Sequence, residues 1–157
     1  MSLTVYESLL AEADQEGIIT KEKNLQANDG LIVGNRIAIR DGMTGVKKSC
    51  VLAEELGHYY TSSGNILDQD DVSNRQQELR ARAWAYDKRI GLIGLIRAFE
   101  YGCRNMYEMA DFLEVTEAFL DDALNYYKNQ YGMYKRVDNY VIYFEPHLFI
   151  ADMNFGI

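Results

Sequence analysis

Apolar and polar residues recur along this chain with the periods of short helices and of β-hairpins. Apolar side chains at helical spacing predict an amphipathic helix over residues 3–16, with Gly17 at its C-terminal end. Residues 30–42 predict a hairpin, because apolar pairs flank Gly34 and Asn35, which readily adopt the positive φ of a tight turn. These two segments predict an α+β fold.

A second helix is expected after the hairpin. Thr44 is a good N-cap for this helix, and Gly64 lies beyond its end. Residues 63–74 are mostly polar and are expected to form a loop, after which Ser73 or Asn74 caps a third helix.

From Leu92 onward the pattern is again helical, and it ends in a hairpin. Three short helices are expected, of which the last is capped by Thr116 and ended by Gly132. Alternating residues around Asp138 and Asn139 then predict two antiparallel strands. The apolar tail beyond them is expected to pack back on this part of the chain.

Length and composition fit a globular protein of one modest domain or a domain with a small appendage. The chain has 157 residues, of which 48% are hydrophobic and 25% are charged. A soft boundary near Gly91–Gly94 divides it into a core over residues 1–91 and a helical segment over residues 92–157 that carries the terminal hairpin and packs on the core.

Charge and hydropathy exclude several classes of partner and of site. The net charge of −8 and the pI of about 4.7 oppose binding to a phosphate backbone. No run of apolar residues is long enough for a transmembrane helix, and no basic segment indicates a signal peptide. Cys50 and Cys103 are the only cysteines, which excludes a zinc site built from cysteine and favours reduced thiols in a cytoplasm.

The stretch EELGH, from Glu54 to His58, differs by one residue from the His-Glu-x-x-His signature of zinc peptidases. A helix turns by about 100° per residue, so Glu54 and His58 point the same way and Glu55 stands beside them. Zinc helices use this placement, with two ligands one turn apart and a general base next to them. Gly57 lets a second backbone approach this helix closely.

A third ligand is needed, because zinc in a hydrolase takes three protein ligands and keeps one position for water. Glu78 on the next helix is the candidate. Ala81 and Ala85 are small enough for that helix to pack closely on the first, and Glu78 would then face Glu54 and His58. A structural interpretation stays open, because the helix dipole favours acidic pairs in the first half of a helix and single histidines are often structural.

The order of hairpin, VLAEELGHYYT helix, loop and E-x-x-A-x-x-W-A helix resembles the ImmA/IrrE family of metallopeptidases. The resemblance covers residues 5–130 in outline and is sharpest over residues 52–58 and 78–85. It implies a mainly helical, zincin-like core with a small β-hairpin or sheet, followed by a C-terminal helical segment.

The family resemblance also implies roles for individual residues. Glu55 matches the general base, His58 the second histidine ligand and Glu78 the third ligand. Glu54 departs from the pattern, because the family has its first histidine there. Glutamate is a legitimate zinc ligand, but two carboxylates and one imidazole neutralise a divalent ion, so bound water is acidified less. The harder ligand set can also shift the preference from Zn toward Mn or Fe.

Three further residues have both a functional and a structural interpretation. His147 can in principle replace the missing imidazole, or it is an ordinary surface or packing histidine. Tyr59 or Tyr60 can donate a hydrogen bond to an oxyanion, or both are packing aromatics in a chain with 12 tyrosines.

Residues 105–128 have the outline of a helix-turn-helix, with Thr116 capping the second helix. Acidic residues occur throughout this segment, and no Lys or Arg lies between Asn105 and Tyr127, so phosphates would repel it. Direct binding to nucleic acid is therefore not expected. Its apolar residues are interpreted as core, and its remaining role as recognition of a protein such as a basic DNA-binding partner.

Two functional hypotheses follow from the sequence. The first is a cytoplasmic ImmA/IrrE-like metalloprotein of a phage or mobile element, which by family implication cleaves or binds a helix-turn-helix repressor and so relieves repression. The second is a catalytically inactive module that antagonises a regulator by contact alone. Glu55→Gln separates them, because it abolishes cleavage in the first case and changes nothing in the second.

Overall fold

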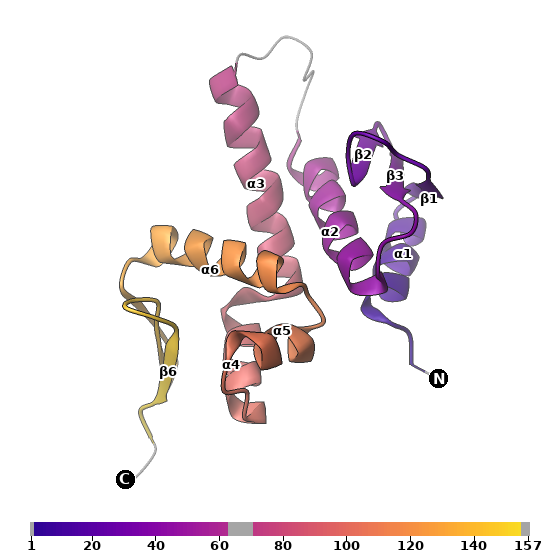
Figure 1. The fold of residues 1–157 in the computed structure, drawn as a ribbon. Coiled ribbons are helices and arrows are strands. Elements are labelled where there is room, and N and C mark those ends of the chain that lie inside the picture. Colours follow the sequence, from indigo (N-terminus) through magenta and orange to yellow (C-terminus); the bar gives the residue numbers. More distant parts are fainter. Residues whose placement is uncertain (1, 63–70, 155–157) are drawn as a thin grey trace. The chain divides into compact units, whose positions relative to one another are not determined.

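In the computed structural model, residues 2–62 and 71–154 are described, and they form an α+β fold of helices with two three-stranded sheets (Figure 1). The chain divides into two compact units, Met1–Lys88 and Arg89–Ile157, whereas the sequence pattern places a soft boundary near Gly91–Gly94. None of the described helices is long and apolar enough to cross a membrane.

The first unit contains three helices and one sheet among its described residues: α1 (Val5–Gln15), β1 (Ile19–Lys23), β2 (Gly30–Val33), β3 (Arg36–Arg40), α2 (Gly45–Thr61) and α3 (Asp71–Arg89, which ends one residue past the boundary). Thr4 begins α1 with a capping box, in which its hydroxyl accepts a hydrogen bond from the Glu7 backbone N–H. The predicted helix over residues 3–16 is thus confirmed, and its observed ends differ from the prediction by two residues at the start and one at the end.

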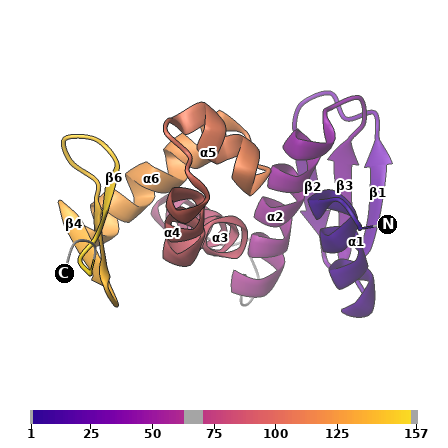
Figure 2. The same ribbon diagram turned by 90° about the horizontal axis from the view of Figure 1, so that it is seen from below.

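The first sheet has the strand order β1-β3-β2, and Figure 2 shows β3 between its two neighbours. β2 and β3 form the predicted hairpin, with Gly34 at a positive φ of 61° in its turn. β1 pairs in parallel with β3, and the sequence pattern missed it because four of its five residues are exposed. Ile37 and Ile39 of β3 are buried on the side of the sheet that carries α2.

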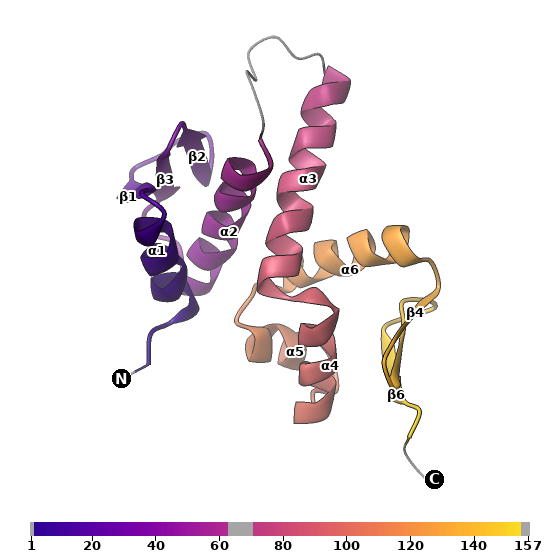
Figure 3. The same cartoon turned by 180° about the vertical axis from the view of Figure 1, so that it is seen from behind.

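α2 follows the sheet and lies alongside α3 in Figure 3. The Thr44 hydroxyl accepts a hydrogen bond from the Lys47 backbone N–H, so this predicted N-cap is confirmed. The prediction that Ser73 or Asn74 caps α3 is wrong, because the helix already begins at Asp71. Polar composition alone suggested a loop there, yet residues 71–74 contain no Gly or Pro to break a helix. The rest of the predicted loop, with Gly64, lies outside the described residues.

The second unit contains three helices and the second sheet in the part of the chain that the structure describes: α4 (Gly91–Tyr101), α5 (Met106–Leu113), α6 (Glu117–Tyr131), β4 (Tyr134–Val137), β5 (Tyr140–Tyr143) and β6 (Phe149–Asp152). Thr116 caps α6 as predicted, accepting a hydrogen bond from the Phe119 backbone N–H. Glu114 ends α5 in the left-handed conformation, at the turn of the helix-turn-helix outline.

The predicted terminal hairpin is confirmed as β4 and β5, with Asp138 at a positive φ of 53° in the turn. The apolar tail contributes a third strand, β6, which pairs with β5. The core of this unit includes Leu120 and Ile142, both fully buried. The Gly91 N–H donates to the Tyr127 hydroxyl at 3.1 Å, which ties the start of α4 to α6.

Candidate functional site

The two helices that carry the candidate ligands meet at Gly57 of α2 and Ala81 of α3. A Cβ atom added to Gly57 would lie 2.2 Å from the backbone carbonyl oxygen of Ala81, and Ala81 is fully buried. No side chain fits in that space, so only glycine permits the two backbones to approach this closely. The predicted close packing of the alanine face against Gly57 is therefore confirmed.

This helix contact brings His58 and Glu78 together. The imidazole Nε2 of His58 lies 3.0 Å from the carboxylate Oε2 of Glu78, a hydrogen-bonding distance. The side chains are 27% and 44% exposed, so both are partly open to solvent. Of the three ligands expected from the sequence, these two lie in direct contact.

Glu55 is half-buried beside this pair, beneath strand β2. A Cβ added to Gly30 of β2 would lie 2.8 Å from Oε1 of Glu55 and 2.7 Å from a methyl carbon of Val51. Glycine at the start of β2 thus makes room for the carboxylate, a role that the sequence pattern did not reveal. Burial raises the pKa of Glu55 to about 7, and the charges of Glu54 and Glu78 act in the same direction.

Glu54 lies one helical turn before His58, as expected, and its charge acts on Glu55 and on Arg82. Among the described residues, however, no group of three or more His, Cys, Asp or Glu is arranged to hold a metal ion. The structure therefore joins His58 to Glu78 but does not bring Glu54 into a three-ligand group with them.

Arg82 is a member of the site to which the sequence analysis assigned no role. Its Nε donates to Oε1 of Glu78 at 3.0 Å, so the two oxygens of this carboxylate face different partners, Arg82 and His58. Partial burial acts to lower the pKa of Arg82, but the charges of Glu78 and Glu54 raise it above its ordinary value. The spacing of four residues between Glu78 and Arg82 on one helix is the signal that predicts this pair.

Tyr59 and Tyr60 take part in packing between aromatic rings. The ring of Tyr60 stacks on Trp84 of α3 with centroids 5.1 Å apart, and Tyr59 meets Tyr60 edge to face at 5.2 Å. This stack joins α2 to α3 close to His58. It gives both tyrosines the packing role that the sequence analysis left open as one of two interpretations.

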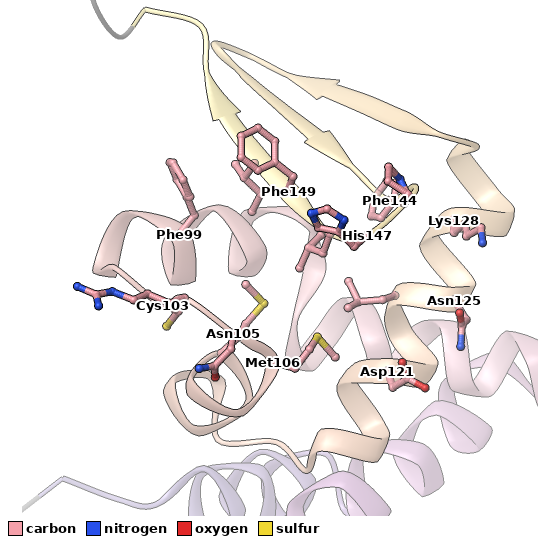
Figure 4. Close-up of a pocket in the computed structure, with 16 residues that line it drawn as sticks. Phe99, Cys103, Asn105, Met106, Asp121, Asn125, Lys128, Phe144, His147 and Phe149 are labelled. Carbon is pink, nitrogen blue, oxygen red and sulfur yellow. The ribbon is translucent and has the colours of Figure 1, made fainter.

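His147 belongs to the second unit, where it is exposed on the connection between β5 and β6. It lines a cavity of about 690 Å³ within that unit (Figure 4). Apolar side chains of α4, α5 and β6 and polar side chains of α6 surround this space; they include Phe99, Met106, Phe149, Asp121 and Lys128. The sequence pattern did not reveal this cavity.

Comparisons with known proteins found no match to this chain among protein-family models, curated proteins or solved structures. Functional conclusions therefore depend on the chemistry of its own residues.

The donors gathered where α2 meets α3 are one imidazole nitrogen and several carboxylate oxygens. This set fits the chemistry of a borderline divalent ion such as Zn, and its excess of oxygen also suits Mn or Fe. A half-buried carboxyl with a pKa near neutrality, as at Glu55, is typical of a general base. Donor types that suit a divalent ion thus lie close to a carboxyl that can accept a proton, although the described residues place no three such ligands around one point.

The raised pKa of Glu55 predicts how the stability of the metal-free protein depends on pH. Its pKa is about 7 in the folded chain and 4.5 ordinarily, so the folded state binds the extra proton and loses stability as pH rises between these values. Removal of this charge by Glu55→Gln is expected to stabilise the protein by about 2 kcal/mol at pH 8 and by little at pH 4. Urea unfolding in the presence of a chelator measures the difference.

Glu117→Gln is the matched control, because Glu117 is exposed in the first turn of α6 and belongs to the second unit. For Glu117→Gln, the difference in unfolding free energy from wild type should not increase as pH rises. An advantage of Glu55→Gln that is the same at pH 4 and pH 8 would contradict the raised pKa.

Proposed function

We propose that this protein is a metal-dependent endopeptidase of the ImmA/IrrE type with a zincin-like core, and that it cleaves a helix-turn-helix transcriptional repressor of a phage or mobile element. The observation that carries the proposal is the 3.0 Å contact between His58 Nε2 and Glu78 Oε2, with Glu55 beside them. The sequence pattern and the family resemblance pointed to these three residues, which lie on two different helices.

In this proposal His58, Glu78 and Glu54 hold the metal. When bound, the metal supplies Lewis-acid polarisation of the scissile carbonyl and lowers the pKa of a water molecule at the site. Glu55 accepts the proton of that water molecule and delivers it to the leaving nitrogen. The carboxyl is half-buried beneath Gly30, so the side chain of Glu55 can move only within a limited space.

Strand β2 supports a protein substrate. It is an edge strand of its sheet, and within residues 2–62 and 71–154 it pairs only with β3. An edge strand presents unpaired backbone groups to which an extended peptide can add. Gly30, at the start of β2, adjoins Glu55, so a peptide paired along this edge would run past the general base. Leu31 and Val33 are 47% and 70% exposed on β2 and offer apolar contacts.

The charge of the chain supports a basic protein as its partner. A net charge of −8 attracts a DNA-binding repressor with a basic face and disfavours direct contact with nucleic acid. The proposal places the protein in the cytoplasm, where such a repressor acts.

One observation favours a second candidate function, an inactive module that antagonises the repressor by contact. Oε1 of Glu78 is already paired with the guanidinium of Arg82, so a cation is present at this carboxylate without any metal. In this case Glu54 marks the loss of a ligand, and the acidic surface of the fold is what the partner recognises.

Metal content decides between the two. Purified protein, incubated with zinc or manganese and then desalted, is expected to retain about one metal ion per chain by elemental mass spectrometry. Glu54→Ala, His58→Ala and Glu78→Ala should each lose it, whereas Glu117→Ala in the second unit should keep it. Protein that retains no metal under either condition would refute the peptidase and leave the binding module.

A further inference from the structure

The candidate ligand set carries an unusual concentration of negative charge. Glu54 and Glu55 are neighbours on α2, and the carboxylate of Glu78 on α3 lies 3.0 Å from His58 of α2. A zinc site with two histidines has one carboxylate fewer among its ligands. A counter-cation close to these carboxylates offsets their mutual repulsion when no metal is bound.

Arg82 is placed to be that counter-cation. It lies one helical turn after Glu78, and its Nε contacts Oε1 of that carboxylate at 3.0 Å while His58 contacts Oε2. The guanidinium also lies within the field of Glu54 on the other helix. An ordinary pair of charges on a helix surface has no such link to a second helix.

The same contact puts Arg82 in conflict with a metal ion. Both oxygens of Glu78 have partners, so a metal that binds through this carboxylate must displace one of them or share it. A divalent ion at the site would also repel the guanidinium. The Arg82 side chain is 49% exposed, so it can move away into solvent without opening the fold.

We propose that Arg82 is a built-in competitor of the metal, which holds Glu78 in the metal-free protein and thereby weakens the binding of divalent ions at this site. The inference rests on the proposed function, because it assigns the regulation of metal occupancy at the same ligands. Competition of this kind is reciprocal: Arg82 lowers metal affinity, and bound metal loosens Arg82. Metal would then occupy the site only above a threshold concentration that Arg82 sets.

The test compares metal affinity in variants of the full chain. Titration of Zn²⁺ and of Mn²⁺ against a chromophoric chelator gives the dissociation constants of wild type, Arg82→Gln and Arg80→Gln. Arg80 is the matched control, since it is an exposed arginine two residues earlier on the same helix and faces another direction. Arg82→Gln is expected to bind at least about tenfold more tightly than wild type, and Arg80→Gln within about twofold.

Two further variants tie the gain to Glu78. Arg82→Lys keeps the charge and should bind metal nearly as weakly as wild type. Glu78→Gln removes a proposed ligand, so this variant and its combination with Arg82→Gln should bind metal equally poorly, which would show that the gain in Arg82→Gln requires the Glu78 carboxylate. Thermal melts followed by circular dichroism establish that each variant is folded.

The outcomes separate this inference from the proposed function. Metal binding by wild type with equal or weaker affinity in Arg82→Gln would overturn the competitor and leave the peptidase intact. Metal binding by Arg82→Gln but not by wild type would support the competitor and refute the peptidase activity of the wild-type chain. Absence of binding in wild type and in Arg82→Gln would overturn both.

Discussion

Replacing Gly57 with alanine is expected to destabilise the first unit by about 3 kcal/mol or more, a large fraction of the stability of an ordinary domain. The added methyl carbon would lie 2.2 Å from the Ala81 carbonyl oxygen, and that atom is backbone and cannot rotate away. Relief of the overlap requires α2 and α3 to separate. Chemical denaturation of wild type and variant, followed by circular dichroism, measures the loss.

Gly45→Ala is the matched control for this experiment. Gly45 begins the same helix, and a Cβ added there would meet nothing within 4 Å. Alanine is the better helix former, so this variant should be as stable as wild type or more stable by up to about 1 kcal/mol. Equal stability of the Gly57 and Gly45 variants would show that the two helices do not touch at Ala81 in solution.

Separation of the helices has a consequence for the site. His58 and Glu78 meet only because α2 and α3 are close, so a Gly57→Ala variant that still folds should lose the 3.0 Å contact between them. The metal affinity of this variant should then be as low as that of His58→Ala. Metal binding thus reports on the helix contact independently of stability.

Glu55→Gln is expected to lower the rate of repressor cleavage by about 10³-fold or more while the protein still binds metal. The amide has the shape of the carboxylate but cannot accept the proton of water, and Glu55 is not one of the proposed ligands. A time course of repressor cleavage, read by mass spectrometry, gives the rate. Metal content of the same sample shows that the ligand set is intact.

The same variant distinguishes cleavage from antagonism by contact. In the peptidase, Glu55→Gln should leave the repressor intact and bound to its operator in a DNA-binding assay. Release of the repressor from DNA by Glu55→Gln, as efficient as by wild type, would contradict proteolysis and support the binding module. Glu117→Gln is the control that should cleave like wild type.

Local signals along the chain were sufficient for many elements of the fold. Thr44 and Thr116 begin helices because their hydroxyls accept a hydrogen bond from a backbone N–H in the first turn, which depends only on neighbouring residues. Turns at Gly34 and Asp138 follow from residues that tolerate a positive φ. The start of α3 was misplaced because polar composition does not by itself end or delay a helix.

Two strands depended on distant partners and had no clear local signal. β1 is mostly exposed and owes its conformation to parallel pairing with β3, which lies beyond an intervening strand in the chain. β6 has four residues and is defined by its pairing with β5. Short strands of this kind are set by hydrogen bonds to a neighbour and not by their own alternation.

The sequence by itself determined which side chains share a helix face: Glu54 and His58 on α2, because a helix repeats every 3.6 residues. It also indicated that Gly57 and Ala81 allow two helices to approach. Only the tertiary structure decided that His58 meets Glu78 at 3.0 Å, that Glu55 is buried against Gly30, and that Arg82 shares the Glu78 carboxylate. Those contacts depend on where one helix lies against another helix or strand, and periodicity within a single segment carries no information about that position.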